Sequence, residues 1–155
     1  MSCTRFAFLA ILAAALWVGG LWVVGYLAVP VLFSAQADRQ LAGMLAGEIF
    51  SRMFVLDLIC AGFLLLFAQW GIRDKSGRKI LLWVLLPMLV SLLAINLGLQ
   101  PAMTQLKLAA LPQIVMESPL AGRFGMLHGI SSLLYLAESL LGLLLLWRLA
   151  HLRQG

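Results

Sequence analysis

The sequence predicts an all-α integral membrane protein, a four-span transmembrane helical bundle with both termini in the cytoplasm. Two observations predict the fold class. First, 63% of the 155 residues are hydrophobic and only 11% are charged, whereas soluble domains have roughly 45–50% apolar and about 25% charged residues. Second, the apolar residues gather in four stretches of about 20 residues or more, which is the length at which an α-helix crosses about 30 Å of hydrocarbon.

We expect these spans at residues 6–30, 50–70, 80–100 and 124–147, within one domain that covers residues 1–155. Pro30 is expected to end the first span, and residues 41–54 are expected to form an amphipathic lead-in to the second span. Residues 71–79 are polar and predict a tight turn. Pro87 predicts a kink in the third span. The last connection contains Pro101, Pro112 and Pro119 and is therefore not expected to be one continuous helix.

The basic residues indicate the topology. They are scattered around the spans and do not gather on one soluble face, so the net charge of +5 does not predict nucleic-acid binding. In a four-span protein the amino terminus, the second connection and the carboxy terminus share one side. That side holds seven of the eleven Lys and Arg residues, and the positive-inside rule places it in the cytoplasm. The seven are Arg5, Arg73, Lys75, Arg78, Lys79, Arg148 and Arg153.

Small residues in the first span predict close helix packing. Small side chains let helix backbones approach one another in lipid, where they are enriched at helix–helix contacts. The expected packing positions are Ala15, Gly19, Gly20 and Gly25.

Polar residues inside the spans are the candidate functional residues, because placing them in hydrocarbon costs free energy. At about 1.5 Å per residue, Asp57 lies roughly 10 Å below Phe50, while Asn96 and His128 lie roughly 6 Å below the outer ends of their spans. Ser131 shares a helix face with His128. These side chains either form hydrogen bonds with one another that join the helices, or they form an outward-facing pocket that binds an ion, a proton or a polar group. In the second interpretation Arg52, Gln100 and Arg123 stand at the mouth.

Glu138 is the other intramembrane acid, and no polar residue of another span is expected at its depth. An acidic residue at a helix centre costs about 2.5–3.5 kcal/mol on insertion. Glu138 is therefore expected to be protonated or to meet a partner chain.

We expect no metal site, no cofactor and no enzymatic activity. A zinc or copper site needs three or four converging His, Cys, Asp or Glu ligands, and His128 is the only histidine inside the spans. Cys3 and Cys60 are too few for a disulfide framework, and one lies at the cytoplasmic end while the other lies inside a span. The sequence contains no nucleophile elbow, no phosphate-binding glycine loop and no redox CxxC motif.

Three motifs indicate a family: WVGGLWVVGYLAVPVLF at residues 17–33, LGLQPAM at residues 97–103 and FGMLHGISS at residues 124–132. In this order and spacing, the chain resembles the bacterial members of the transmembrane protein 205-like family, known as domain of unknown function 4149. The resemblance implies a multi-pass protein of the bacterial inner (cytoplasmic) membrane, and it implies no established activity. The positions that match the family pattern are Pro30, Phe33, Phe50, Gln100, Pro101 and His128.

Two functional hypotheses follow. The first is a non-enzymatic accessory or scaffold subunit that acts by helix association with other membrane proteins or with further copies of this chain. The second is the binding or transport of a small ion or polar solute through a periplasm-facing pocket around Asp57, Asn96 and His128. In both hypotheses the lipid bilayer is the surrounding medium and nucleic acid is not a partner.

Overall fold

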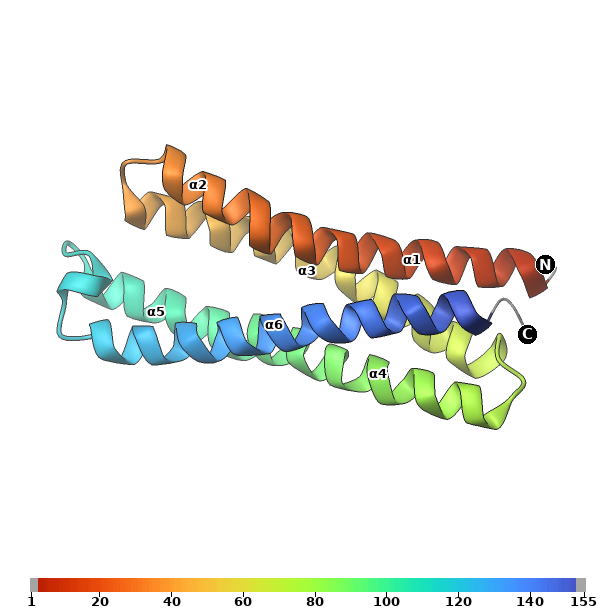
Figure 1. The fold of residues 1–155 in the computed structure, drawn as a ribbon. Helices are drawn as coiled ribbons and strands as arrows, with labels where there is room; N and C mark the ends of the chain where they lie inside the picture. Colours follow the sequence, from red (N-terminus) through yellow and green to blue (C-terminus); the bar gives the residue numbers. More distant parts are fainter. Residues whose placement is uncertain (1–2, 153–155) are drawn as a thin grey trace.

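The computed structural model describes residues 3–152, which form four long helical rods (Figure 1). The first rod consists of α1 (Cys3–Val23), the π-helical turn η1 (Val24–Ala28) and α2 (Val29–Ala35). The second is α3 (Arg39–Trp70). The third consists of α4 (Lys75–Leu93), the π-helical turn η2 (Ala94–Leu99) and α5 (Gln100–Ala110). A short 3₁₀ turn, η3 (Val115–Glu117), precedes the fourth rod, α6 (Ala121–Leu152).

Each rod is long and apolar enough to cross a membrane, and this confirms the all-α, four-span fold class. The chain is therefore a small multi-pass membrane protein. The rods are longer than the predicted spans, because each continues past its apolar centre into polar sequence. The expected lead-in at residues 41–54 is part of the continuous helix α3, which begins at Arg39. The start of α1, the end of α6 and the α3–α4 turn lie at the same end of the bundle (Figure 1).

Proline does not end the rods where the sequence predicted. Pro30 and Pro101 stand in the first turn of α2 and α5, each directly after a π-helical turn. A proline lacks the backbone N–H, and its ring clashes with the carbonyl of the residue four positions earlier in a regular α-helix. The wider π turn changes the hydrogen-bond pairing at that point, which lets the rod continue. The prediction that Pro30 ends the first span was therefore wrong, and α2 extends the rod to Ala35.

Two aspartates start the second and third rods. Asp38 accepts hydrogen bonds from the backbone N–H groups of Gln40 (2.8 Å) and Leu41 (3.1 Å). Asp74 accepts from those of Ser76 (3.3 Å) and Gly77 (2.6 Å). Each carboxylate satisfies N–H groups that have no partner inside the helix. These caps fix the two short turns that join the rods.

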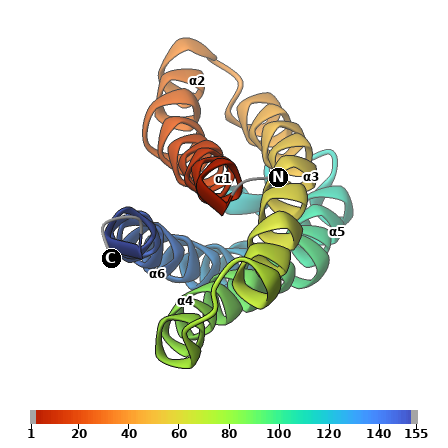
Figure 2. The same cartoon turned by 90° about the vertical axis from the view of Figure 1, so that its right-hand side faces the viewer.

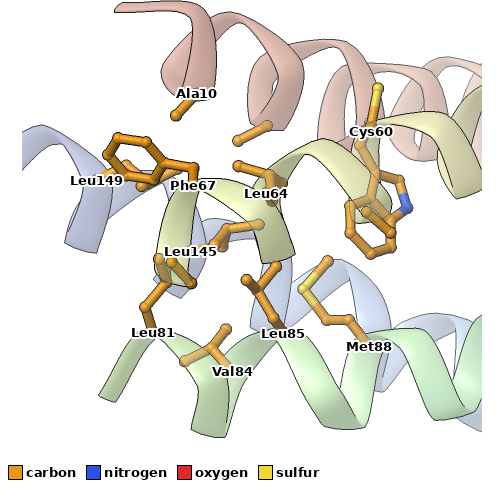
Figure 3. Packing of buried hydrophobic residues seen from close by; sticks show 14 of the residues in the cluster. Ala10, Cys60, Leu64, Phe67, Leu81, Val84, Leu85, Met88, Leu145 and Leu149 are labelled. Atoms are coloured by element: carbon orange, nitrogen blue, oxygen red, sulfur yellow. The ribbon is translucent and has the colours of Figure 1, made fainter. Parts of the chain in front are cut away.

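The four rods pack as a ring in which each touches two neighbours. Viewed from the end in Figure 2, α1 lies beside α3 and α6, and α4 lies beside the same two helices. An apolar core fills the ring toward the end that holds the α3–α4 turn. Figure 3 shows its members, including Leu64, Leu85, Met88 and Leu145, which are almost completely buried. This half of the bundle is closed.

The bundle opens toward its other end. There α2 and α3 stay together, as do α5 and α6, but the two pairs diverge (Figure 1). Large apolar side chains cover the outside, which fits a surface that faces lipid. Trp70 and Trp83, on either side of the α3–α4 turn, are 73% and 70% exposed. Tryptophan is enriched where a membrane protein meets the interface.

The small residues of the first span have two different roles. At Gly20 a Cβ atom would contact the Met53 side chain of α3, and at Gly25 it would contact the Tyr135 ring of α6. These two glycines pack between helices as predicted. Ala15 and Gly19 are exposed, and a Cβ atom at Gly19 would meet nothing within 4 Å, so their role in helix packing stays a prediction. Ala10 and Ala14 pack into the core from that helix.

Candidate functional site

Two acidic side chains meet in the centre of the bundle. Asp57 is 3% exposed and comes from α3, while Glu138 is 1% exposed and comes from α6. They reach the same depth because α3 and α6 run in the same direction and each acid stands just past the middle of a 32-residue helix. The prediction that Glu138 has no polar neighbour on another span was wrong. It placed the start of the second helix at Phe50, whereas α3 begins at Arg39 and carries Asp57 deeper.

Asp57 and Glu138 line a small cavity of about 20 Å³, together with residues of the three other helical segments around it. A cavity of this size has room for about one water molecule. The remaining lining residues are Leu21, Phe50, Met53, Leu92, Ile95, Asn96 and Tyr135. The wall is therefore mostly apolar, with four polar side chains that converge on one point.

Each acid keeps one carboxyl oxygen without a hydrogen-bond partner, Oδ1 of Asp57 and Oε1 of Glu138. The indole nitrogen of Trp17 lies near the Glu138 carboxyl, although it too lacks a partner of good geometry. Among residues 3–152 the one ion pair joins Arg52 to Glu48, so no Lys or Arg neutralises the two buried acids. A buried polar group without a partner is costly and needs an explanation.

Asn96 and Tyr135 are two of the polar lining residues, and each donates a hydrogen bond to a backbone carbonyl. The Asn96 side-chain nitrogen donates to the backbone carbonyl of Leu92 at 3.0 Å, which leaves the amide oxygen free to accept. The Tyr135 hydroxyl donates to the backbone carbonyl of Leu21 at 2.6 Å, and the Gly25 backbone N–H also faces this hydroxyl. The Tyr135 hydroxyl thus binds the backbone of the first rod directly before the π turn η1.

A second tyrosine strengthens the contact between the first and fourth rods. The Tyr26 hydroxyl donates to Ser139 Oγ at 3.1 Å, and Ser139 Oγ donates to the Tyr135 carbonyl at 2.9 Å. The rings of Tyr26 and Tyr135 also meet edge to face, with centroids 6.1 Å apart. These bonds fix the α6 segment that carries Glu138.

An open groove lies above the cavity, between the first half of α3 and the segment η2–α5. Its volume is about 850 Å³. The α3 wall contains Gly43 and Gly47, and at Gly47 a Cβ atom would meet nothing within 4 Å. The Lys107 side chain crosses the groove and donates to the Gly43 carbonyl at 3.1 Å. Polar lining residues come from both walls: Gln40, Glu48, Ser51, Asn96, Gln100, Thr104 and Gln105.

Asn96 lines both the groove and the small cavity. The groove begins at the open end of the bundle and reaches down to this residue. The two acids therefore lie directly below the floor of the groove, on the far side of the Asn96 side chain. Below the acids, the closed apolar core begins (Figure 3).

The structure brings together some of the predicted site residues and separates others. Asp57 and Asn96 share the cavity, and Gln100 lines the groove. His128 is exposed and stacks on Phe124 with ring centroids 6.0 Å apart. Placing His128 in the same pocket as Asp57 was wrong, because the helix pairs have already diverged at the first turns of α6 (Figure 1).

Three further predicted residues do not line the cavity or the groove. Arg52 is on an exposed face of α3 and donates to Glu48 at 2.7 Å. Ser131 is half-buried and Arg123 is exposed, both on α6. They were expected at the mouth or the wall because the four helices were assumed to run parallel to one another as far as the outer surface of the membrane. The actual mouth is between α3 and α5, where Lys107 is the basic residue.

No larger cluster of ligating side chains occurs in the part of the chain that the structure describes. Within it, no three His, Cys, Asp or Glu side chains come together as the ligands of a metal ion would. Cys60 is buried in the core with a free thiol. The side chain of Cys3 and the whole of Arg153, which entered the disulfide and topology arguments, lie outside what is described.

The comparison with known proteins gives the family. The family model described as Domain of unknown function (DUF4149) matches residues 12–111. The chain belongs to this family. The match confirms the family that the motifs indicated, and the matched segment contains Asp57 and Asn96, whereas Glu138 lies beyond it. No curated protein matches the chain, and neither does any solved structure.

Proposed function

We propose that this DUF4149 protein binds a proton at the Asp57–Glu138 pair and transports it across the membrane, and that the pair exchanges the proton with the periplasmic side through the groove between α3 and α5. The observation that carries the proposal is the pair itself: two almost completely buried carboxyl groups that line one cavity, each with an unpartnered oxygen. Two bare carboxylates in one apolar cavity repel each other, and neither has a cation beside it. A proton on one carboxyl group removes the repulsion, and protons on both also remove the cost of a buried charge.

The surroundings favour a proton over a metal cation. Divalent cations such as Ca²⁺ and Mg²⁺ take about six or more oxygen ligands. The cavity offers at most six: four in the two carboxyl groups, one in the Asn96 amide and one in the Tyr135 hydroxyl. Its volume of about 20 Å³ leaves no room for the several water molecules that Mg²⁺ keeps or that complete a larger Ca²⁺ shell. A space of about 20 Å³ suits one water molecule that can relay a proton between the acids.

The groove supports exchange with one side of the membrane. It extends from the open end of the bundle to Asn96, and its polar side chains can hydrogen-bond a chain of water molecules. On the other side of the acids, the core residues Leu64, Leu85 and Leu145 are almost completely buried and close-packed. The proposed site is thus open outward and closed inward, as alternating-access proteins are in one of their states.

Reconstituted vesicles test this proposal. Purified protein is reconstituted into liposomes that contain a pH-sensitive dye, and the pH of the external solution is lowered. Asp57→Asn and Glu138→Gln keep the shape of each side chain but remove its ionisation, and we expect both to reduce proton entry to the leak of protein-free vesicles. Glu117→Gln removes an exposed acid outside the site and should behave like the wild type.

The outcome separates the two interpretations of the buried polar residues. Loss of proton entry in variants that keep the helical circular dichroism and the elution volume of the wild type supports a proton site. If both variants unfold or aggregate while Glu117→Gln does not, the acids act as structural glue between helices. Wild-type vesicles that leak no faster than empty ones would contradict transport.

The location is part of the same proposal. We place this protein in the bacterial inner membrane, with the α3–α4 turn in the cytoplasm and the groove facing the periplasm. Arg73, Lys75, Arg78 and Lys79 support this orientation, because they gather at the closed end of the bundle. Cysteine introduced at Ser76 or Gln113 should be labelled by a membrane-impermeant reagent from opposite sides. Labelling of position 76 from the periplasm would contradict the orientation.

Helix association is a second candidate function, favoured by the exposed small residues of α1. Ala15 and Gly19 are exposed, and a Cβ atom at Gly19 would meet nothing within 4 Å. Such a surface suits the close approach of a helix from another copy or another protein. Crosslinking and native-size measurements in mild detergent should show a complex that Gly19→Leu disrupts. A strictly monomeric wild type without a co-purifying protein would exclude this function.

A further inference from the structure

One face of α4 combines a basic cluster with an apolar surface. Lys75, Arg78 and Lys79 lie in its first turns, and they are followed on the same side by Leu82, Trp83, Leu86 and Pro87. These seven residues, which we call the basic face of α4, border a hollow of about 550 Å³. Their spacing of mostly three or four residues places them along one side of the helix.

None of the three cations of this face forms an ion pair among the described residues, where the one ion pair joins Arg52 to Glu48 on another helix. Asp74 is the nearest acid along the chain, and its carboxyl oxygens accept the backbone N–H groups of Ser76 and Gly77. Even with the charge of Asp74, the three cations leave a net positive charge on the basic face, which a ligand with one or more negative charges would neutralise.

The dimensions of the face correspond to those of a lipid. From Lys75 to Pro87 the helix rises about 18 Å at 1.5 Å per residue. The headgroup region of one leaflet is about 5–8 Å thick, so the cations reach the phosphate level and the lower residues reach the acyl chains. Trp83 is 70% exposed and Leu86 is 49% exposed, which leaves an apolar surface open to a chain.

We propose that the basic face of α4 binds one anionic phospholipid of the leaflet at the α3–α4 end. Its phosphate lies among Lys75, Arg78 and Lys79, and an acyl chain runs along Leu82 and Leu86. Basic residues just outside a span attract anionic lipids in this way. The site is at the opposite end of the bundle from the groove, and it is independent of the proposed proton binding.

Native mass spectrometry tests the lipid site. The full chain is released from nanodiscs that contain equal amounts of phosphatidylglycerol and phosphatidylcholine, and the retained lipids are identified. Wild type should retain phosphatidylglycerol preferentially. Each cation that contacts the headgroup contributes a factor of about five, so Lys79→Gln should lower the preference about fivefold and Arg78→Gln/Lys79→Gln more.

Arg73→Gln is the matched control. Arg73 is exposed in the turn just before α4, but it does not border the hollow. It removes the same charge from the same end of the protein and should leave the preference unchanged. Equal losses in Arg73→Gln and Lys79→Gln would show a general field of the surface and would overturn the proposal. The proposal would also be overturned if Arg78→Gln/Lys79→Gln retained phosphatidylglycerol as strongly as the wild type does. Displacement of the lipid by inorganic phosphate alone would show that the acyl chain is not bound.

Discussion

The Tyr135 hydroxyl offers the sharpest test of how the first and fourth rods are held together. Tyr135→Phe removes the 2.6 Å hydrogen bond to the Leu21 carbonyl and leaves the packed ring in place. This bond joins the first and fourth rods in a water-poor interior, and its short donor–acceptor distance is that of a strong hydrogen bond. Hydrogen bonds between membrane helices average about 0.6 kcal/mol and reach about 1.7 kcal/mol. We therefore expect a loss of about 1–2 kcal/mol in the free energy of unfolding.

Tyr26→Phe is the matched control for this prediction. Tyr26 is half exposed, and its 3.1 Å bond reaches Ser139, whose hydroxyl keeps a second partner in the Tyr135 carbonyl. Its removal leaves no buried group unsatisfied, and we expect a cost below about 0.6 kcal/mol. Equilibrium unfolding in mixed micelles, followed by circular dichroism, measures both variants. If the two variants lost equal free energy of unfolding, or if Tyr135→Phe lost none, the bond from the Tyr135 hydroxyl to Leu21 would not stabilise the contact between the first and fourth rods.

Three further changes test the packing and the helix ends. Gly142→Ala should cost about 1–3 kcal/mol by overpacking, since its Cβ would lie 2.8 Å from Val18 Cγ2, whereas Gly62→Ala has free space and should not lower the melting temperature. Leu145→Ala empties a completely buried position and should cost about 2–5 kcal/mol in the same unfolding assay. Asp74→Ala removes the cap of α4 and should cost about 1 kcal/mol. If Leu145→Ala left the free energy of unfolding unchanged, the core would be loosely packed.

The sequence was sufficient for the fold class because hydrophobic length alone determines whether a helix can span a membrane. It was less informative on where the rods begin and end. Polar residues such as Gln40 and Gln105 continue the helices beyond the apolar centre, so composition placed the start of α3 and the end of the third rod too far inward. Pro30 and Pro101 were misleading for a related reason, since a π turn before each proline preserves the rod.

The candidate site was predictable in part. Asp57, Asn96 and Glu138 were each recognisable as costly intramembrane groups. Their mutual arrangement was not, because counting depth from a misplaced helix end separated Asp57 from Glu138. His128 was assigned to the site from its depth below the outer end of its span, and depth along a helix does not show that the helix pairs diverge. The hydrogen bond from Tyr135 to the Leu21 carbonyl joins distant segments, and the sequence carries no local signal for it.

The protonation of Asp57 and Glu138 is the most direct test of the central claim. Infrared difference spectroscopy of the reconstituted protein, recorded as the external pH is raised and lowered, detects the carbonyl band of a protonated carboxylic acid. We predict a reversible band that is altered or lost in both Asp57→Asn and Glu138→Gln and is unchanged in Glu117→Gln. A wild-type spectrum without such a band, or a band that both variants retain, would contradict a proton site at this pair.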